Sequence, residues 1–319
     1  MTNQRVIWID NLKGFLIIMV VAGHVLQTAI DSNIDSIYME QIFEWIYSFH
    51  MPLFFGISGY VYSLTLRKNL QSDDFWSKWK KRIYSLLYIY MVYSILMWNF
   101  KYFFFNSLAK ESVNIATLFL LPLQPISVYW YIHTLIGMFL IVPIFEKKIK
   151  PLNYRCLLMM VIIQCISIHF EWPYALNKIV YMFPFFASGV LIDNFIHDYI
   201  HVERLVMIFF IFLLYGAEVL SFRELSIIKA YLWGMFFVLL FKEYFSKKIG
   251  LITYLGENCL SVYLFHPYVV ASLKVLFIKF GLLNWEYVIT SLICSIVTCL
   301  IIIIMTRHRI LRKYIYSPF

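Results

Sequence analysis

The chain has 319 residues, of which 62% are hydrophobic and only 14% are charged. Soluble domains contain roughly 45–50% apolar residues, so this composition excludes an ordinary soluble enzyme and predicts an all-α, polytopic integral membrane protein. The net charge is +9. We expect no nucleic-acid partner, because the basic residues fall in short segments between apolar runs and form no solvated basic domain.

Ten apolar segments are long enough to be transmembrane helices. They cover residues 12–30, 42–66, 83–106, 128–146, 155–170, 177–195, 203–220, 227–245, 258–279 and 286–306. The stretch 114–125 is apolar but short and contains Pro122 and Pro125, which favours a re-entrant or interfacial segment. No small-x-small cleavage pattern follows the first segment, which predicts a retained helix. We therefore expect a single transmembrane domain over residues 1–319, with no appended soluble domain.

The positions of lysine and arginine predict the orientation. With a cytoplasmic N-terminus, the inner segments carry about three times as many of the 27 basic residues as the outer segments. Short cytoplasmic loops of membrane proteins show this bias. An even number of spans then places both termini in the cytoplasm of a protein of the cell (inner) membrane, in contact with its lipids.

The cysteines show no pattern of a functional site. None of the five has a paired spacing or a histidine cluster nearby, so we expect no disulfide and no bound metal. They lie in apolar segments, at Cys156, Cys165, Cys259, Cys294 and Cys299.

Lys13 and His24 lie on the first apolar segment, with ten residues between them. Eleven steps are close to three helical turns, so both side chains project from one face, about 16 Å apart along the axis. A histidine within the bilayer indicates a functional site unless a neighbouring helix simply hydrogen-bonds it. Asp10 is either placed to orient Lys13 from three residues away or is a helix N-cap.

A basic segment between the second and third apolar segments carries more charge than topology requires. Its cations suit a polyanion, which is either anionic lipid headgroups or the phosphates of a cytosolic cofactor. The six residues are Arg67, Lys68, Lys78, Lys80, Lys81 and Arg82.

The second apolar segment contains a second histidine, His50, two residues before Pro52. Proline removes a backbone donor and kinks or breaks a helix, so His50 is a candidate to line the same cavity as His24. Gly56 and Gly59 predict the close approach of another helix.

These landmarks together resemble acyltransferase family 3, whose first helix carries an arginine or lysine, ten residues and then a histidine. Further segments agree with the family in order across the whole chain. They are residues 54–60 (FFGISGY), 80–83 (KKRI), 130–136 (WYIHTLI), 183–189 (FPFFASG) and 260–267 (LSVYLFHP). Residues 8–14 (WIDNLKG) and 49–55 (FHMPLFF) look most similar to the branch of the family related to fucose 4-O-acetylase.

Two features depart from the family pattern. The basic stretch is mostly lysine, where many relatives have two arginines three residues apart, which weakens the prediction of bidentate phosphate recognition. No esterase-like domain follows the last apolar segment, so any handover of the acyl group to a second domain requires another polypeptide.

The resemblance implies transfer of an acyl group, most often acetyl from acetyl-CoA, to a hydroxyl of a sugar in a surface glycan or its lipid-linked precursor. Neutral imidazole is the usual base near pH 7, so we expect His24 to be the general base rather than an acyl carrier. Asp10, Lys13 and His50 are the other expected catalytic residues. The expected cofactor-binding residues are Lys13, Arg67, Lys80, Lys81 and Arg82, and the expected substrate-binding residues are Ser58, Trp130, Tyr131 and His266.

Two other functions fit the same sequence. Ten spans, a proline-interrupted helix and an intramembrane histidine suit a transporter or flippase of a lipid-linked sugar or small solute. A non-catalytic partner of polysaccharide-assembly proteins is the third possibility. A basic segment on the same side of the membrane as Lys13, whose helix carries the intramembrane His24, favours the enzyme. Transporters often have an internal repeat, and we find none between the two halves of this sequence.

Overall fold

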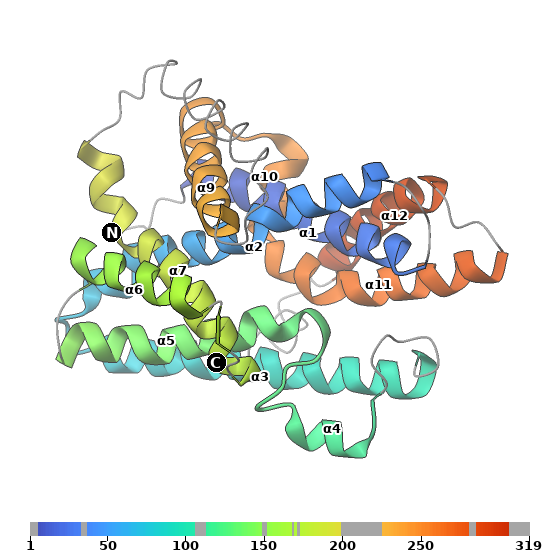
Figure 1. Ribbon diagram of the computed structural model, residues 1–319, viewed down its shortest axis with the longest axis horizontal. Helices are drawn as coiled ribbons and strands as arrows, with labels where there is room; N and C mark the ends of the chain where they lie inside the picture. Colours follow the sequence, from blue (N-terminus) through green and yellow to red (C-terminus); the bar gives the residue numbers. More distant parts are fainter. Residues whose placement is uncertain are drawn as a thin grey trace. The chain divides into compact units, whose positions relative to one another are not determined.

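The computed structural model describes residues 6–32, 37–105, 113–148, 152–167, 169–170, 173–198, 225–280 and 285–305, and these contain helices and no strand. The predicted all-α class is therefore confirmed. In chain order (Figure 1), the helices are α1 (Ile7–Ile30), α2 (Ile37–Thr65), α3 (Phe75–Phe100), α4 (Ile115–Leu120), α5 (Trp130–Lys148), α6 (Tyr154–Ser167), α7 (Tyr174–Asp198), α9 (Leu225–Tyr244), α10 (Gly250–Glu257), α11 (Cys259–Phe280) and α12 (Trp285–Met305).

Five of the described helical segments are long and apolar enough to cross a membrane. They are Ile7–Ile30, Phe75–Phe104, Ser127–Lys147, Cys259–Phe277 and Trp285–Met305, and Tyr154–Ser167 and Leu176–Ile192 are shorter apolar helices. The predicted spans 42–66 and 227–245 are helical as α2 and α9, whereas 203–220 lies outside the described residues. The membrane class is thus confirmed, but the count of ten is not. Within 114–125, α4 reaches only about 9 Å and is too short to cross.

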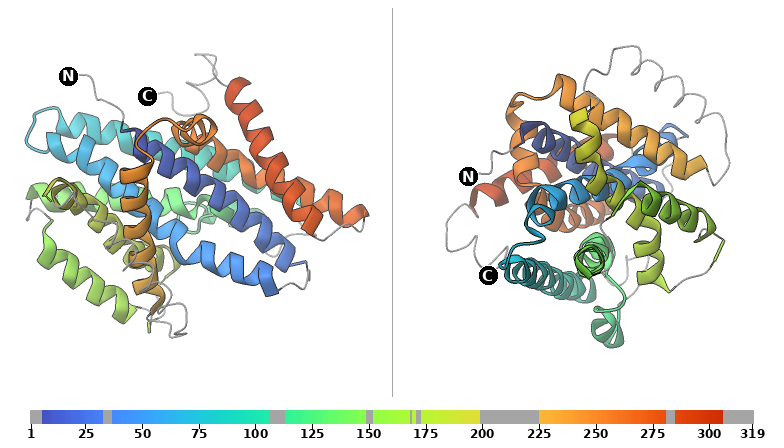
Figure 2. Two further views of the ribbon diagram at one scale, coloured as in Figure 1. Left: turned by 90° about the horizontal axis from the view of Figure 1, so that it is seen from above. Right: turned by 90° about the vertical axis from the view of Figure 1, so that its left-hand side faces the viewer.

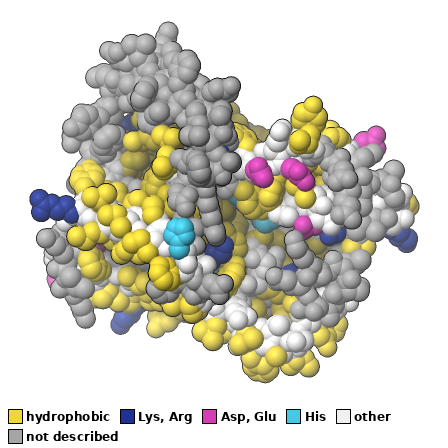
Figure 3. Space-filling model, viewed as in Figure 1, with side chains coloured by type: hydrophobic (Ala, Val, Ile, Leu, Met, Phe, Trp, Pro, Cys, Tyr) yellow, Lys and Arg dark blue, Asp and Glu magenta, His cyan; other side chains and the backbone are white. Residues whose placement is uncertain are grey.

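The two faces of α12 show how these helices meet lipid. The exposed side is mostly apolar, with Ile289, Ile293, Val297 and Ile301, while the opposite face is buried and carries Tyr287, Ser291, Ser295 and Cys299. Small and polar residues inward with apolar residues outward is the pattern of helices packed in a bilayer. Figure 3 shows mostly hydrophobic side chains among the described residues of the face it draws.

The chain forms two compact units. Unit 1 comprises Met1–Phe54 and Tyr199–Met305, and unit 2 comprises Phe55–Asp198 and Thr306–Phe319. Helix α2 contributes to both, and it continues through Pro52, so the proline does not break it. The single-domain organisation of residues 1–319 stays a prediction.

Helix α1 is the centre of unit 1, where it packs on α9, α10, α11 and α12 (Figure 1). Its contact with α10 is a backbone-to-backbone crossing. The Cα of Gly14 faces the carbonyl of Ile252, and the Cα of Gly256 faces the carbonyl of Asp10. A side chain at either glycine would overlap the opposing carbonyl, so glycine is required at both positions.

In unit 2, α5 packs on α3 and α7, and α6 packs on α7. The right-hand view of Figure 2 shows α3 and α5 side by side, both seen nearly end-on. A second glycine crossing joins α2 and α7, where Gly59 faces the carbonyl of Phe186 and Gly189 faces the carbonyl of Gly56. The predicted close approach of another helix at Gly56 and Gly59 is confirmed.

Candidate active site

Asp10 and Lys13 form an ion pair in the first turns of α1. The Lys13 Nζ lies 2.7 Å from the Asp10 Oδ1, and the Asp10 side chain is only 5% exposed. The N-cap of α1 is Val6, so Asp10 is not the cap residue. Of the two roles expected for Asp10, orientation of Lys13 is the one with a matching contact.

Asn11, beside this pair, ties α1 to the segment that precedes α10. Its Nδ2 donates to the backbone carbonyls of Phe245 (2.6 Å) and Lys247 (2.8 Å), and its Oδ1 accepts from the Thr253 hydroxyl at 2.5 Å. Asn11 is fully buried. These bonds fix the start of α1, although the sequence alone gave Asn11 no role beyond its place in the family motif.

His24 stacks on His266 of α11, with ring centroids 5.3 Å apart and an interplanar angle of 30°. The Nδ1 of His266 lies 3.0 Å from the Val262 carbonyl. A carbonyl only accepts, so Nδ1 carries the hydrogen, and a neutral ring then has a bare lone pair on Nε2. This Nε2 is buried and has no hydrogen-bond partner among the described residues. The pair therefore presents an unused proton acceptor in the interior of unit 1.

His50 belongs to the same histidine cluster. Its Nδ1 donates to the Ile46 carbonyl at 2.7 Å, and the edge of Tyr47 packs against its ring at 4.7 Å between centroids. A charge on His24 acts electrostatically on both His50 and His266. Helices α1, α2 and α11 thus carry three interacting histidines, His24, His50 and His266. That His50 and His24 line one cavity stays a prediction.

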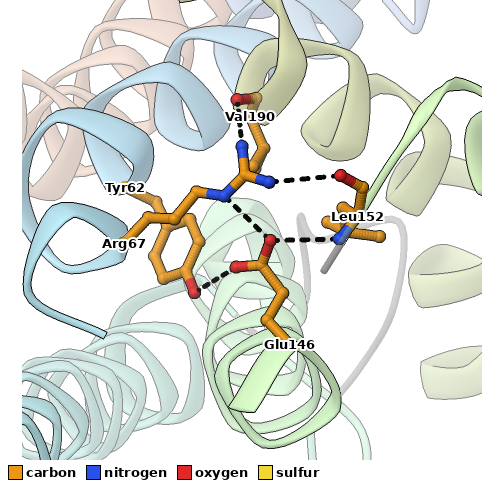
Figure 4. Close-up of polar contacts among 5 residues, drawn as sticks. All are labelled: Tyr62, Arg67, Glu146, Leu152 and Val190. Carbon is orange, nitrogen blue, oxygen red and sulfur yellow. Dashed lines mark hydrogen bonds and ion pairs between the residues drawn. The ribbon is translucent and has the colours of Figure 1, made fainter. Parts of the chain in front are cut away.

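Arg67 of unit 2 is engaged by protein groups (Figure 4). Its Nε lies 2.9 Å from the Glu146 Oε1, and its Nη1 and Nη2 donate to the carbonyls of Val190 (3.2 Å) and Leu152 (3.1 Å). Glu146 also accepts from the Tyr62 hydroxyl at 2.8 Å and from the Leu152 amide at 3.3 Å. Its carboxylate is completely buried. The structure thus gives Arg67 a role in joining α2, α5, α7 and the segment after α5.

The other expected cofactor-binding cations lie on a helix and not in a loop. Residues 78–82 form the early turns of α3, where Lys80 and Lys81 are exposed. Arg82 is exposed too, but its guanidinium lies over the Phe139 ring, with its Cζ 5.6 Å from the centroid. Trp79 anchors this part of α3 by donating from its Nε1 to the Phe139 carbonyl at 2.7 Å. Lys80 and Lys81 are therefore the cations most available to an anion.

The expected substrate-binding residues divide between the units. In unit 2, the Ser58 and Tyr131 hydroxyls lie 2.8 Å apart, and the Phe55 ring contacts both Tyr131 (4.9 Å) and Trp130 (6.1 Å). His266 lies in unit 1 with His24. Ser58, Trp130 and Tyr131 thus form one cluster, and His266 belongs to another.

Comparison with known proteins gives the family. The model of the acyltransferase domain matches residues 6–307. The chain is similar to Nodulation protein NolL of Sinorhizobium fredii, with 28% identity over 199 residues, which is 61% of this chain and 51% of that protein. It is also similar to Nodulation protein NolL of Mesorhizobium japonicum, with 29% identity over 197 residues, or 60% and 48% of the two chains.

These alignments span about half the length of the curated relatives. No solved structure matches the chain. The family model, in contrast, covers nearly every residue and includes the first helix with Lys13 and His24. The chain belongs to acyltransferase family 3.

Proposed function

We propose that this protein is a membrane O-acyltransferase that moves an acyl group, acetyl from acetyl-CoA, to a hydroxyl of a sugar in a surface polysaccharide or its lipid-linked precursor. The observation that carries the proposal is the stacked pair of half-buried His24 and fully buried His266 among apolar helices of an acyltransferase family member. Imidazole is the usual general base for such a transfer.

In the proposed reaction, His24 takes the proton of the sugar hydroxyl while the hydroxyl oxygen attacks the thioester carbonyl carbon. The carbon–sulfur bond then breaks, the acyl group stays on the sugar oxygen, and the thiolate of CoA leaves with the proton that His24 returns. The bare Nε2 of His266 suits a hydrogen bond from a neighbouring hydroxyl of the acceptor sugar, since the single proton of the reacting hydroxyl goes to His24. We assign His50 a supporting role in this cluster. The Asp10–Lys13 pair, about 16 Å from His24 along α1, is assigned to the donor instead.

The donor phosphates are assigned to the exposed cations. Lys80 and Lys81 are free for a polyanion on the surface of α3, which fits the several phosphate groups of a CoA thioester. Arg82 and Lys13 remain in the proposed donor-binding set. Arg67, held by Glu146, would act indirectly, by fixing the end of α2 from which the basic segment begins.

The test is acetyl-CoA consumption by purified protein in nanodiscs, with a panel of free and lipid-linked sugars as acceptors. Release of CoA that depends on an added sugar, together with mass-spectrometric detection of the acylated sugar, supports the proposal. If the protein binds no acetyl-CoA, the proposal fails. Movement of a lipid-linked sugar across the same protein in liposomes would then favour a transporter.

A further inference from the structure

Lys178 of α7 is a half-buried cation whose contacts among the described residues are aromatic and not acidic. Its Nζ lies 5.0 Å from the centroid of the Trp130 ring and 5.7 Å from that of Tyr174. The ion pairs among the described residues use other groups. Ring faces stabilise an ammonium but leave its three N–H donors without acceptor oxygens. The ammonium is therefore free to bind an anionic oxygen.

The position of Lys178 on its helix points the same way. It lies one turn after the first residue of α7, Tyr174. The N-terminal end of a helix carries a partial positive charge and favours anions, so a cation there does not stabilise the helix. The charge of Lys178 and the positive end of the helix instead attract the same kind of group, an anion.

The side chains around Lys178 are those that bind carbohydrate. We define the Lys178 cluster as Lys178, Tyr174, Trp130, Phe55, Tyr131 and Ser58. Trp130, Ser58 and Tyr131 are half-buried, and an indole ring beside two hydroxyls 2.8 Å apart is the combination that stacks on a sugar ring and bonds its hydroxyls. The backbone just before Trp130 is unusual, since Ser127 has a φ of +53°, in the left-handed region that few non-glycine residues adopt.

Lys178 lies at the other end of α5 from the Arg67–Glu146 pair. Trp130 begins α5, whereas Glu146, the partner of Arg67, lies sixteen residues further along the same helix. This separation corresponds to about 24 Å along the helix axis. Lys178 is therefore far from the Arg67–Glu146 pair, whereas Arg82 of the proposed donor set interacts electrostatically with Tyr131 of the cluster.

We propose that the Lys178 cluster binds the acceptor of the acyl transfer, and that this acceptor is a sugar carrying an anionic group, a carboxylate or a phosphate. The inference rests on the proposed function. Trp130 stacks on the sugar ring, Ser58 and Tyr131 bond its hydroxyls, and Lys178 pairs with the anionic group. Phosphate on a lipid carrier and a carboxylate on the sugar itself share this chemistry.

The experiment measures binding without acetyl-CoA and transfer with it, in nanodiscs of phosphatidylcholine. The ligands are glucose and galactose, their uronic acids, their 1-phosphates and the same sugars on a polyprenyl phosphate. Wild-type protein should bind the anionic sugars roughly tenfold or more tightly than the neutral ones, the size expected of a charge pair shielded from water. Comparing the affinities for uronic acids and sugar 1-phosphates shows whether the bound anion is a carboxylate or a phosphate. Comparing free with lipid-linked sugars shows whether the lipid carrier is needed.

Lys178→Met keeps the aliphatic stem and removes the charge. It should abolish the preference for anionic sugars by raising their dissociation constant and KM, with binding of neutral sugars changed less than about twofold. Lys178→Arg should retain most of the preference. The matched control is Lys147→Met, because the Lys147 Nζ makes the same kind of contact with the rings of Phe75 and Trp76, at 4.9 and 5.3 Å.

Three results would overturn the inference. Wild-type protein could bind neutral and anionic sugars equally, or Lys178→Met could weaken both equally, as a purely structural lysine would. The variant could also change only the response to added phosphatidylglycerol, which would make Lys178 a lipid anchor. Charge-dependent sugar binding without any acyl transfer by wild-type protein would leave the Lys178 cluster standing and refute the proposed function instead.

Discussion

The rings of His24 and His266 stack 5.3 Å apart, and the Nδ1 hydrogen of His266 is held by the Val262 carbonyl. Two imidazoles this close in an apolar interior do not both carry a charge, because like charges there repel strongly. The pair therefore carries at most one positive charge, which means one proton beyond the N–H of each neutral ring. That is the requirement of a general base that takes a proton from the acceptor and returns it to the departing thiolate.

We expect His24→Ala to lose acyl transfer, with kcat lowered by about 100-fold or more, the usual contribution of a general base. Membrane insertion and abundance should stay normal, because His24 is only partly buried. Sugar-dependent release of CoA measures the effect. The control is His133→Ala, because the Nε2 of His133 bonds the Pro122 carbonyl in unit 2, outside the histidine cluster. Transfer by His24→Ala close to the wild-type rate would show that the base is another residue.

Substitutions of His266 can separate its two nitrogens. Asparagine keeps an amide donor near the position of Nδ1, so it can still bond the Val262 carbonyl, but it places nothing at Nε2. Glutamine extends an acceptor oxygen towards the position of Nε2. We expect His266→Asn to lower kcat by roughly tenfold, the value of one hydrogen bond that positions the acceptor, and His266→Gln to lower it less.

Thermal unfolding distinguishes this effect from a structural one. Both His266 variants should melt within a few degrees of wild type. Equal loss of activity in the two variants together with a lowered melting temperature would assign His266 a packing role only.

How far the sequence predicts this site depends on the range of each contact. The Asp10–Lys13 pair and the His24 position follow from helical periodicity within α1 and were predictable. The partners that come from distant segments were not. Nothing in the sequence around Arg67 indicates that Glu146 and the carbonyl of Val190 occupy its donors.

Two other features were missed for related reasons. From sequence, the basic stretch 78–82 falls between two apolar segments, because its charged residues end the apolar pattern. In the structure the same residues belong to the first turns of α3. From sequence, Lys178 has no predicted role, because its contact with Trp130 depends on the packing of α5 on α7. A lone lysine beside an apolar run gives no sequence signal for such a contact.

Neutralising Lys80 and Lys81 together to glutamine should raise the KM for acetyl-CoA by about tenfold and leave kcat nearly unchanged. The reason is that phosphate binding away from the reacting carbon contributes equally in the ground state and the transition state. Lys13→Ala should act in the same direction. The charge-matched control is Lys274→Gln with Lys279→Gln on α11, which the predicted orientation places on the outer side. An unchanged KM would return Lys80 and Lys81 to a role in lipid contact.

Arg67→Met should destabilise the protein by about 3 kcal/mol, because it leaves the buried Glu146 carboxylate without its cation. The double variant Arg67→Met with Glu146→Met should recover part of this loss, since both charges are then removed. Melting temperature in detergent measures the stability. A raised KM for acetyl-CoA without any fall in melting temperature would instead support direct binding of the cofactor by Arg67.

Replacing glycine by alanine should have opposite effects on stability at Gly256, in the crossing of α1 and α10, and at Gly234 of α9, outside it. At Gly256, an added Cβ would overlap the carbonyl of Asp10, so Gly256→Ala must push the helices apart. Overpacking of this kind costs about 1–3 kcal/mol. At Gly234 of α9, the nearest atom to an added Cβ is the Leu53 Cδ1 at 3.9 Å, an ordinary contact. Gly234→Ala should therefore be neutral or stabilise by up to about 1 kcal/mol through helix propensity.

Melting temperatures of the two alanine variants, measured in the same detergent, check this contrast. Gly256→Ala should also lower acyl transfer, because the displaced backbone includes Asp10, the partner of Lys13. If Gly256→Ala is as stable and as active as Gly234→Ala, the close crossing is not required for function. The ion pair at the start of α1 would then tolerate a shift of its backbone.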